Sequence, residues 1–282
     1  MQIIHTISEL RTALKNQVSI AFVPTMGNLH AGHIKLVEMA KQHATCVVVS
    51  IFVNPLQFGK NEDLASYPRT LEADCDKLKQ IGANFVFAPN VQEMYPDFDG
   101  NDLNQSMTIT PSIIASELCG AVRPGHFAGV ATVVMKLFNI VQPNVAVFGK
   151  KDYQQLFIIR ELVRQFNLNV EIIGVDTMRE VDGLAMSSRN GYLTPMQRGE
   201  APRLHKALKL VAEAIQKGNR DFTAIEQQTT QFLTQLGWIV DYISIRSAKT
   251  LLSPNAHDHT LIVLGAAKLG STRLIDNLEI PS

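Results

Sequence analysis

Two histidines spaced three residues apart, His30 and His33, are the residues in this 282-residue sequence best suited to chemistry. They follow the apolar run 20–23, and a helix is predicted to begin at Gly32 between them. Residues three apart share one face of a helix, so both imidazoles can face one ligand. The helix start adds free backbone N–H groups and the positive end of the dipole, and Gly32 has no side chain to hold a nucleotide away. The pattern predicts a site for a polyphosphate whose charge changes during a reaction.

Polar clusters also follow three other apolar runs, and they occupy residues 54–58, 149–155 and 182–190. A fourth cluster, residues 123–130, immediately precedes a predicted helix. Open α/β sheets bind ligands outside the carboxyl ends of their strands. We therefore expect these clusters to converge on one crevice with the two histidines.

The elements that would position these clusters alternate between strands and helices. Apolar and β-branched runs predict strands at 19–24, 46–53, 84–88, 145–148 and 170–175. Amphipathic segments between them predict helices at 32–43, 63–82 (with a break near Pro68), 129–141 and 152–166. Strands that are apolar along their whole length are typical of a parallel sheet covered on both faces. The alternation favours an α/β fold with a doubly wound, Rossmann-like parallel sheet and right-handed crossovers.

The pattern changes after about residue 176. Two helices with capping residues at Thr194 and Asp221 are followed by two predicted strands within 240–268. We expect a Rossmann-like domain over residues 1–176 and a smaller α+β lid domain over residues 177–282.

Composition limits the function classes. The 26 basic and 26 acidic residues leave a formal net charge of +0, and no basic patch indicates a nucleic-acid partner. No leader-like start and no apolar run of roughly 18 residues is present, so we expect a cytoplasmic protein without a membrane partner. Cys46, Cys75 and Cys119 are odd in number and widely spaced, which favours neither a disulfide framework nor a zinc site. We predict no metal site formed by the protein.

The string Pro-Thr-Met-Gly-x-Leu-His-x-Gly-His over residues 24–33 resembles the signature of the pantothenate synthetase family, in the His-x-Gly-His nucleotidylyl-transferase superfamily. The other clusters and residues 273–277 (Arg-Leu-Ile-Asp-Asn) resemble the same family. The resemblance implies a fold of the nucleotidylyl-transferase type and a homodimer. It also implies ATP-dependent condensation of D-pantoate with β-alanine to pantothenate, AMP and pyrophosphate through pantoyl adenylate, with ATP bound as its Mg²⁺ complex. Many members have Glu where this chain has Cys119, so any ionic role of that acid is absent here.

The resemblance also implies the site residues. The implied catalytic residues, with His33 as proton donor, are His30, His33, Lys151, Ser187, Ser188 and Arg189. The implied ATP-binding residues are Met26, Gly27, Asn28, Leu29, His30, Ala31, Gly32, His33, Gly149, Lys150, Lys151, Asp152, Met178, Met186, Ser187, Ser188 and Arg189. Gln57 and Gln155 are implied to bind pantoate and β-alanine, through amides that both donate and accept. Residues 186–189 (Met-Ser-Ser-Arg) are expected to close over the phosphates as a mobile lid.

Transfer of AMP to a carboxylate explains these residue types. A carboxylate resists attack by an amine, whereas the mixed anhydride with AMP has a phosphate leaving group. Negative charge builds on pyrophosphate in that step, so fixed donors must lie where it appears.

Two alternatives remain open at this point. An adenylyltransferase of the same superfamily acting on a phosphate monoester would need a cationic second pocket, whereas this chain offers Gln57 and Gln155. A nucleotide-sensing protein without turnover would tolerate loss of the histidines or of Lys151, and all are present.

Overall fold

A six-stranded parallel sheet forms the larger part of the computed structural model, which describes residues 1–59, 62–255 and 258–281. Its strands are β1 (Gln2–Ile4), β2 (Ile20–Thr25), β3 (Cys46–Ile51), β4 (Phe85–Phe87), β5 (Val145–Gly149) and β6 (Glu171–Val175). Every neighbouring pair is parallel, in the order β1-β4-β3-β2-β5-β6. The predicted doubly wound parallel sheet is therefore confirmed.

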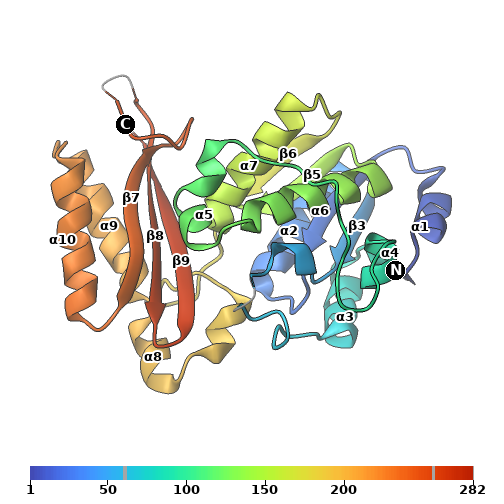
Figure 1. The fold of residues 1–282 in the computed structure, drawn as a ribbon, viewed down its shortest axis with the longest axis horizontal. Helices are drawn as coiled ribbons and strands as arrows, with labels where there is room; N and C mark the ends of the chain where they lie inside the picture. The colour runs from blue at the N-terminus through green and yellow to red at the C-terminus, as the bar shows by residue number, and fades with distance from the viewer. Residues whose placement is uncertain (60–61, 256–257, 282) are drawn as a thin grey trace.

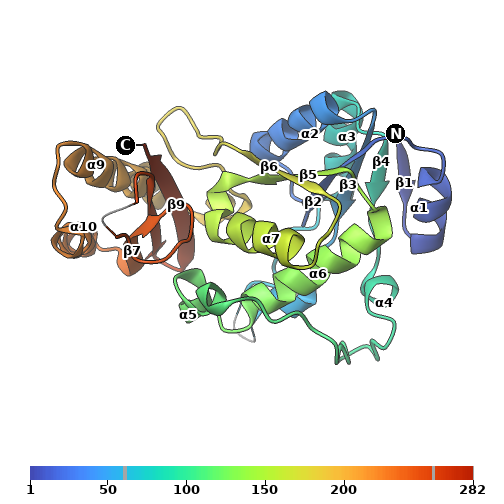
Figure 2. The ribbon, with the colours of Figure 1, turned by 90° about the horizontal axis from the view of Figure 1, so that it is seen from above.

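Helices cover both faces of this sheet (Figures 1 and 2). One face carries α2 (Ala31–His43) and α3 (Leu71–Ile81), and the other carries α1 (Ile7–Leu14), α6 (His126–Val141) and α7 (Tyr153–Gln165). The first five residues of β3 are buried for this reason. An apolar face on each side of every central strand gives the sheet two cores.

The direction of winding changes between two neighbouring strands of the sheet. From β2 the chain moves outward to β3 and β4, whereas β5 pairs with the opposite edge of β2 and is followed by β6. The loop after β2 holds His30, and the 3₁₀ helix η3 (Lys150–Asp152) follows β5 directly. Ligands in open α/β sheets bind at this kind of switch point, outside the carboxyl ends.

The end of the chain forms a second, antiparallel sheet with strands β7 (Ile239–Ser247), β8 (Leu261–Leu269) and β9 (Thr272–Ile280). Before it come α8 (Pro195–Glu200), α9 (Arg203–Gln216) and α10 (Phe222–Gln235). The predicted Thr194 cap is confirmed as a capping box with Pro195 at the first helical position. Residues along β8 alternate between the core under α9 and α10, which takes Val263, and a cluster that includes Phe127 of α6, which takes Leu264. The small sheet therefore packs on both faces, as Figure 1 shows.

The remaining described elements are short: α4 (Val91–Met94), α5 (Cys119–Val122), and the 3₁₀ helices η1 (Pro55–Gln57), η2 (Ile113–Ser116) and η4 (Ser188–Tyr192). Among the described residues, no helix is both long and apolar enough to cross a membrane.

Some elements differ from the sequence expectations. The helix predicted over residues 63–82, with a break near Pro68, is present only after that break, from Leu71. Pro68 disfavours helical geometry in the residue before it, and the Arg69 side chain instead donates to the carbonyls of Leu64 and Tyr67. Strand β9, which carries the 273–277 motif, was not predicted.

Candidate active site

His30 and His33 form the cap of helix α2. The backbone N–H of Gly32 donates to His30 Nδ1 at 3.1 Å, and the backbone N–H of His30 donates to His33 Nδ1 at 3.3 Å. The two ring centroids are 4.1 Å apart, so the imidazoles lie side by side, and their facing one ligand stays a prediction. A Cβ on Gly32 would lie 2.8 Å from Cε1 of His30. Gly32 therefore makes room for this ring, a reason that the sequence did not indicate.

These caps fix the tautomer of both rings. Because a backbone N–H can only donate, each Nδ1 accepts and the proton of each neutral ring lies on Nε2. Burial, followed by the charge of Lys151, lowers the pKa of His30 to about 4. Burial, followed by the neighbouring His30, lowers the pKa of His33 to about 3. In the free protein both histidines are therefore neutral Nε2–H donors at pH 7.

A buried aspartate holds the loop before the histidines. Asp74 of α3 is fully buried, and it accepts hydrogen bonds from the backbone N–H groups of Asn28 and Leu29 at 2.8 and 2.7 Å. Asn28 has a φ of 51° and Gly27 a φ of 84°, so two successive residues take the left-handed conformation. The sequence reasoning missed Asp74, although a charged residue between Leu71 and Leu78 on the apolar side of an amphipathic helix is a signal.

Gln57 lies in a buried network of amides. Its Oε1 accepts from Asn54 Nδ2 at 3.1 Å, and its Nε2 donates to the sulfur of Met26 at 3.3 Å. The orientation of Asn54 is fixed because its Nδ2 also donates to the Gly129 carbonyl, while its Oδ1 accepts from the Tyr95 hydroxyl. Gln57 therefore keeps its carbonyl on Asn54 and its NH₂ group on the Met26 side.

The adjacent glutamines 154 and 155 have different surroundings. Gln154 is buried, donates to the carbonyls of Ile114 and Glu117, and accepts from the N–H of Cys119. Gln155 lines the cavity between the two sheets, and its side chain has no hydrogen-bond partner among the residues that the structure describes. Of the pair, Gln155 has the side-chain amide that is available to a ligand, and its binding of pantoate or β-alanine stays a prediction.

Lys150 and Lys151 also differ in their contacts. Lys150 Nζ lies 2.8 Å from both Asp176 and Glu279, whereas Lys151 lines the cavity and lies 3.7 Å from Asp152. Asn277 of β9 donates to the backbone carbonyls of both lysines, at 2.9 and 2.8 Å. Residues 273–277 are therefore linked directly to the segment that carries the two lysines.

The segment carrying the serines and arginine docks on the histidine loop. Its start is fixed by a hydrogen bond from the N–H of Met186 to the carbonyl of Met178. Ser188 Oγ donates to the Asn28 carbonyl at 3.1 Å, and Ser187 caps η4 by accepting from the N–H of Arg189. The segment thus lies against the residues that begin α2.

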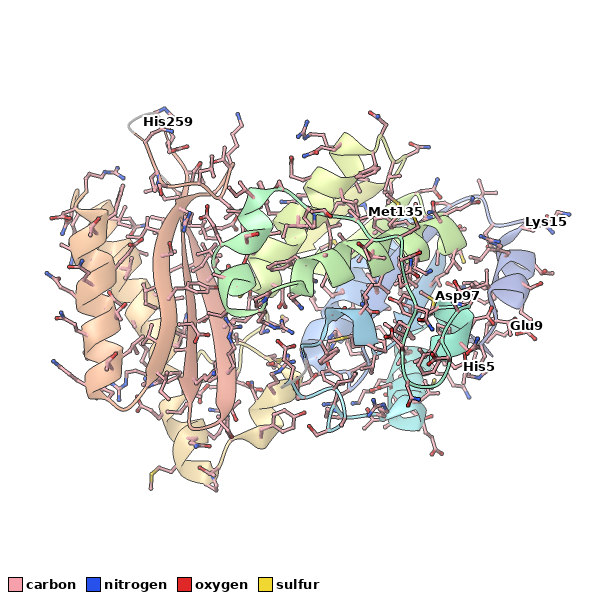
Figure 3. The ribbon with its side chains drawn as sticks, viewed as in Figure 1. His5, Glu9, Lys15, Asp97, Met135 and His259 are labelled. Atoms are coloured by element: carbon pink, nitrogen blue, oxygen red, sulfur yellow. The ribbon has the colours of Figure 1, made fainter. Side chains whose placement is uncertain are left out.

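A cavity of about 700 Å³ lies between the parallel sheet and the small sheet. Five predicted site residues line it: Lys151, Asp152, Gln155, Ser187 and Arg189. Gln57 and the two histidines are not among its lining residues, but Lys151 is close enough to lower the pKa of both rings. His5, by contrast, lies near α1 and α4 at the end of the molecule remote from β7–β9 (Figure 3).

Arg123 and His126 form a chain of contacts that ends at Gln57. Arg123 binds Glu62 through Nε and Nη2, both at 2.6 Å, and its Nη1 donates to His126 Nε2 at 2.9 Å. His126 Nδ1 then donates to the backbone carbonyl of Gln57 at 2.9 Å. Burial, followed by the charge of Arg123, lowers the pKa of His126 to about 4. Both residues therefore order the loop that carries Gln57.

Cys119 lies at the edge of the cavity, with its sulfur 3.0 Å from the Tyr242 hydroxyl and 3.6 Å from Arg273 Nη2. Within the described ranges, no group of three or more His, Cys, Asp or Glu side chains is arranged to hold a metal ion.

Comparisons with known proteins identify the family. The sequence model of the pantoate–β-alanine ligases matches residues 2–279. A pantothenate synthetase from Methylobacillus flagellatus is 67% identical over 279 residues, which are 99% of this chain and 98% of the relative. The chain belongs to the pantoate–β-alanine ligase family. The fold is also that of a solved pantothenate synthetase. The crystal structure of the pantothenate synthetase of Thermus thermophilus has a TM-score of 0.93 and 43% identity, and the match covers 100% of both chains.

A second solved ligase carries ligands. The pantoate–β-alanine ligase of Francisella tularensis, described as complexed with β,γ-ATP and β-alanine, has a TM-score of 0.83 and 34% identity, and the match covers 99% of this chain and 97% of that one.

Proposed function

We propose that this chain condenses D-pantoate with β-alanine to pantothenate, cleaving ATP to AMP and pyrophosphate through a pantoyl-adenylate intermediate. One observation carries the proposal: neutral Nε2–H donors, Lys151 and a docked Ser-Ser-Arg segment lie together at the switch point of the sheet. Family membership supports the same substrates.

In the first step, a pantoate carboxylate oxygen attacks the α-phosphorus of ATP. The bond between that phosphorus and the oxygen bridging to the β-phosphate breaks, and its electron pair leaves with pyrophosphate. Lys151, Ser187, Ser188 and Arg189 are proposed to donate to this growing charge. Both histidines would join them through Nε2–H. Because His33 is neutral in the free protein, we propose hydrogen-bond donation as its role rather than the charge of an imidazolium.

Pantoate is proposed to lie between the side-chain amides of Gln57 and Gln155. Gln57 would present its NH₂ group to oxygen acceptors, because its carbonyl is already bound by Asn54. Gln155 can donate and accept. Neutral amides orient a carboxylate without trapping it as a fixed cation would, which favours pantoate over the phosphate monoester of an adenylyltransferase.

In the second step, the neutral amine of β-alanine attacks the acyl carbon of the bound adenylate. The bond between that carbon and the phosphate oxygen breaks, AMP leaves, and the amine loses a proton. Closure of residues 177–282 over residues 1–176 would exclude water, which favours the neutral amine and protects the anhydride.

ATP is proposed to arrive as its Mg²⁺ complex, with the backbone of residues 26–33, 149–152, 178 and 186–189 around it. Asp152 is the carboxylate at the cavity wall beside Lys151, so it is suited to contact Mg²⁺ through water. A homodimer in the cytoplasm completes the proposal.

The direct test is incubation of the purified protein with ATP, Mg²⁺, D-pantoate and β-alanine, followed by mass spectrometry for pantothenate and AMP. The proposal predicts equal amounts of both products. ADP as the product, or adenylation of a phosphate monoester in place of pantoate, would contradict it.

A further inference from the structure

Arg189 contacts an acidic segment that the sequence reasoning did not connect to the site. Its Nη2 donates to Oδ1 of Asp63 at 3.0 Å, and its guanidinium carbon lies 5.8 Å from the centre of the Tyr67 ring. The Arg189 and Asp63 side chains are 30% and 24% exposed, and Tyr67 is 6% exposed. The arginine is therefore held in place from one side by a carboxylate and from another by a ring.

The arginine of the neighbouring ion pair has a different arrangement. Arg123 donates from Nε and Nη2 to Glu62 and from Nη1 to His126, so all three of its nitrogens are bound. In Arg189 only Nη2 has a side-chain partner among the described residues, and Nε and Nη1 remain available in a side chain that lines the cavity. All three side-chain nitrogens of Arg123 are therefore bound, whereas Arg189 is ordered and keeps two nitrogens without a partner among the described residues.

We propose that Asp63 is a positioning residue for the reaction, holding Arg189 against Tyr67 so that its Nε and Nη1 groups meet the phosphates of ATP. The inference rests on the proposed role of Arg189 in phosphate binding. An arginine side chain loses much rotamer freedom when it binds, and ordering it beforehand removes that loss from the binding step. The negative charge of Asp63 is partly exposed and therefore screened by water and salt, whereas the orientation that it imposes persists.

The test compares Asp63→Asn with Asp182→Asn. Asp182 forms a similar aspartate–arginine pair with Arg198, and neither of those residues lines the cavity. Calorimetry with a non-hydrolysable ATP analogue measures the dissociation constant, and urea unfolding measures stability. We expect Asp63→Asn to raise the dissociation constant of the analogue three- to tenfold without raising the KM for pantoate. We expect Asp182→Asn to change neither that dissociation constant nor that KM. Tyr67→Leu should weaken binding of the analogue to a similar extent as Asp63→Asn.

A double-mutant cycle with Arg189→Ala separates positioning from a structural effect. If Asp63 acts through Arg189, adding Asp63→Asn to Arg189→Ala should cause no further loss of affinity. Tighter binding by Asp63→Asn would show that the carboxylate competes with ATP, and an equal loss in the Arg189→Ala background would show a role independent of the arginine. Either result would overturn the inference. Wild-type protein that makes no pantothenate would instead refute the proposed function, so the two failures are distinguishable.

Discussion

Gly129 of helix α6 lies directly against η1, which carries Gln57, so Gly129→Ala is a direct perturbation of the proposed pantoate site. A Cβ at this position would lie 2.4 Å from the Leu56 carbonyl oxygen and 2.7 Å from the Gln57 N and Cα atoms. Ordinary contacts of a Cβ begin at 3.4 Å. The backbone of η1 or of α6 must therefore move by about 1 Å to accept one methyl group.

Two energies of opposite sign determine the stability of this variant. Overpacking a dense contact is destabilising by about 1–3 kcal/mol, here at the upper end because the overlapping atoms belong to the backbone, and alanine is favoured over glycine inside a helix by roughly 1 kcal/mol. A net loss of about 2 kcal/mol should leave the protein folded. Displacing Gln57 removes a hydrogen bond to pantoate, worth about 1–3 kcal/mol, which corresponds to roughly a 5- to 150-fold loss of affinity.

The assay is steady-state formation of pantothenate, with the KM for pantoate and the KM for ATP measured separately. We expect the KM for pantoate to rise by this factor and the KM for ATP to change little. Gly199→Ala is the matched control, because Gly199 lies in helix α8 and a Cβ there would meet nothing within 4 Å. An unchanged KM for pantoate in Gly129→Ala would refute the claim that Gln57 binds pantoate from this position.

The remaining predictions concern protonation, donors and amides. The pKa of His126 is about 4 when folded and 6.5 ordinarily, so the unfolded chain binds the extra proton between these values and stability falls as pH falls from 6.5 towards 4. In urea unfolding, His126→Gln should therefore lose about 2 kcal/mol less than the wild type between pH 7 and pH 5, and an equal loss would contradict the burial argument. His33→Ala should slow adenylate formation by roughly two to four orders of magnitude in a single-turnover assay while remaining folded, and full activity would refute its role. Lys151→Met should impair the same step far more than Lys150→Met, because the amine of Lys150 is already bound by two carboxylates. The reverse order in that assay would exchange the roles of the two lysines. Gln155→Ala should weaken the binding of pantoate more than the binding of ATP, as measured by calorimetry, and the opposite result would mean that the two subsites are exchanged.

The fold could be predicted because its central strands are apolar along their whole length. Such strands at 46–51 and 145–149 require cover on both faces, which leads to a doubly wound sheet and places the loops after them at one edge. The proximity of the two histidine rings could be predicted from their spacing at the expected start of a helix. The capping geometry that fixes its tautomer could not, because it depends on which ring nitrogen meets which backbone N–H.

The residues that support the site were missed because their partners are distant in sequence. Asp74 binds a loop 45 and 46 residues earlier, and Asn277 binds carbonyls 126 and 127 residues earlier. Periodicity reports the local face of an element and carries no information about such pairs. The break near Pro68 could be predicted, but the residues before it were expected to be helical because their composition is compatible with a helix, and the side-chain contacts of Arg69 with their carbonyls could not be foreseen.

Exchange of labelled pyrophosphate into ATP tests the central claim most directly. The assay contains the protein, ATP, Mg²⁺ and D-pantoate, and no β-alanine. If the carboxylate is adenylated first, label should enter ATP under these conditions, exchange should stop when pantoate is omitted, and Arg189→Ala should suppress it. Exchange that strictly requires β-alanine would contradict a free-standing adenylation step, and exchange supported by a phosphate monoester but not by pantoate would assign the site to an adenylyltransferase.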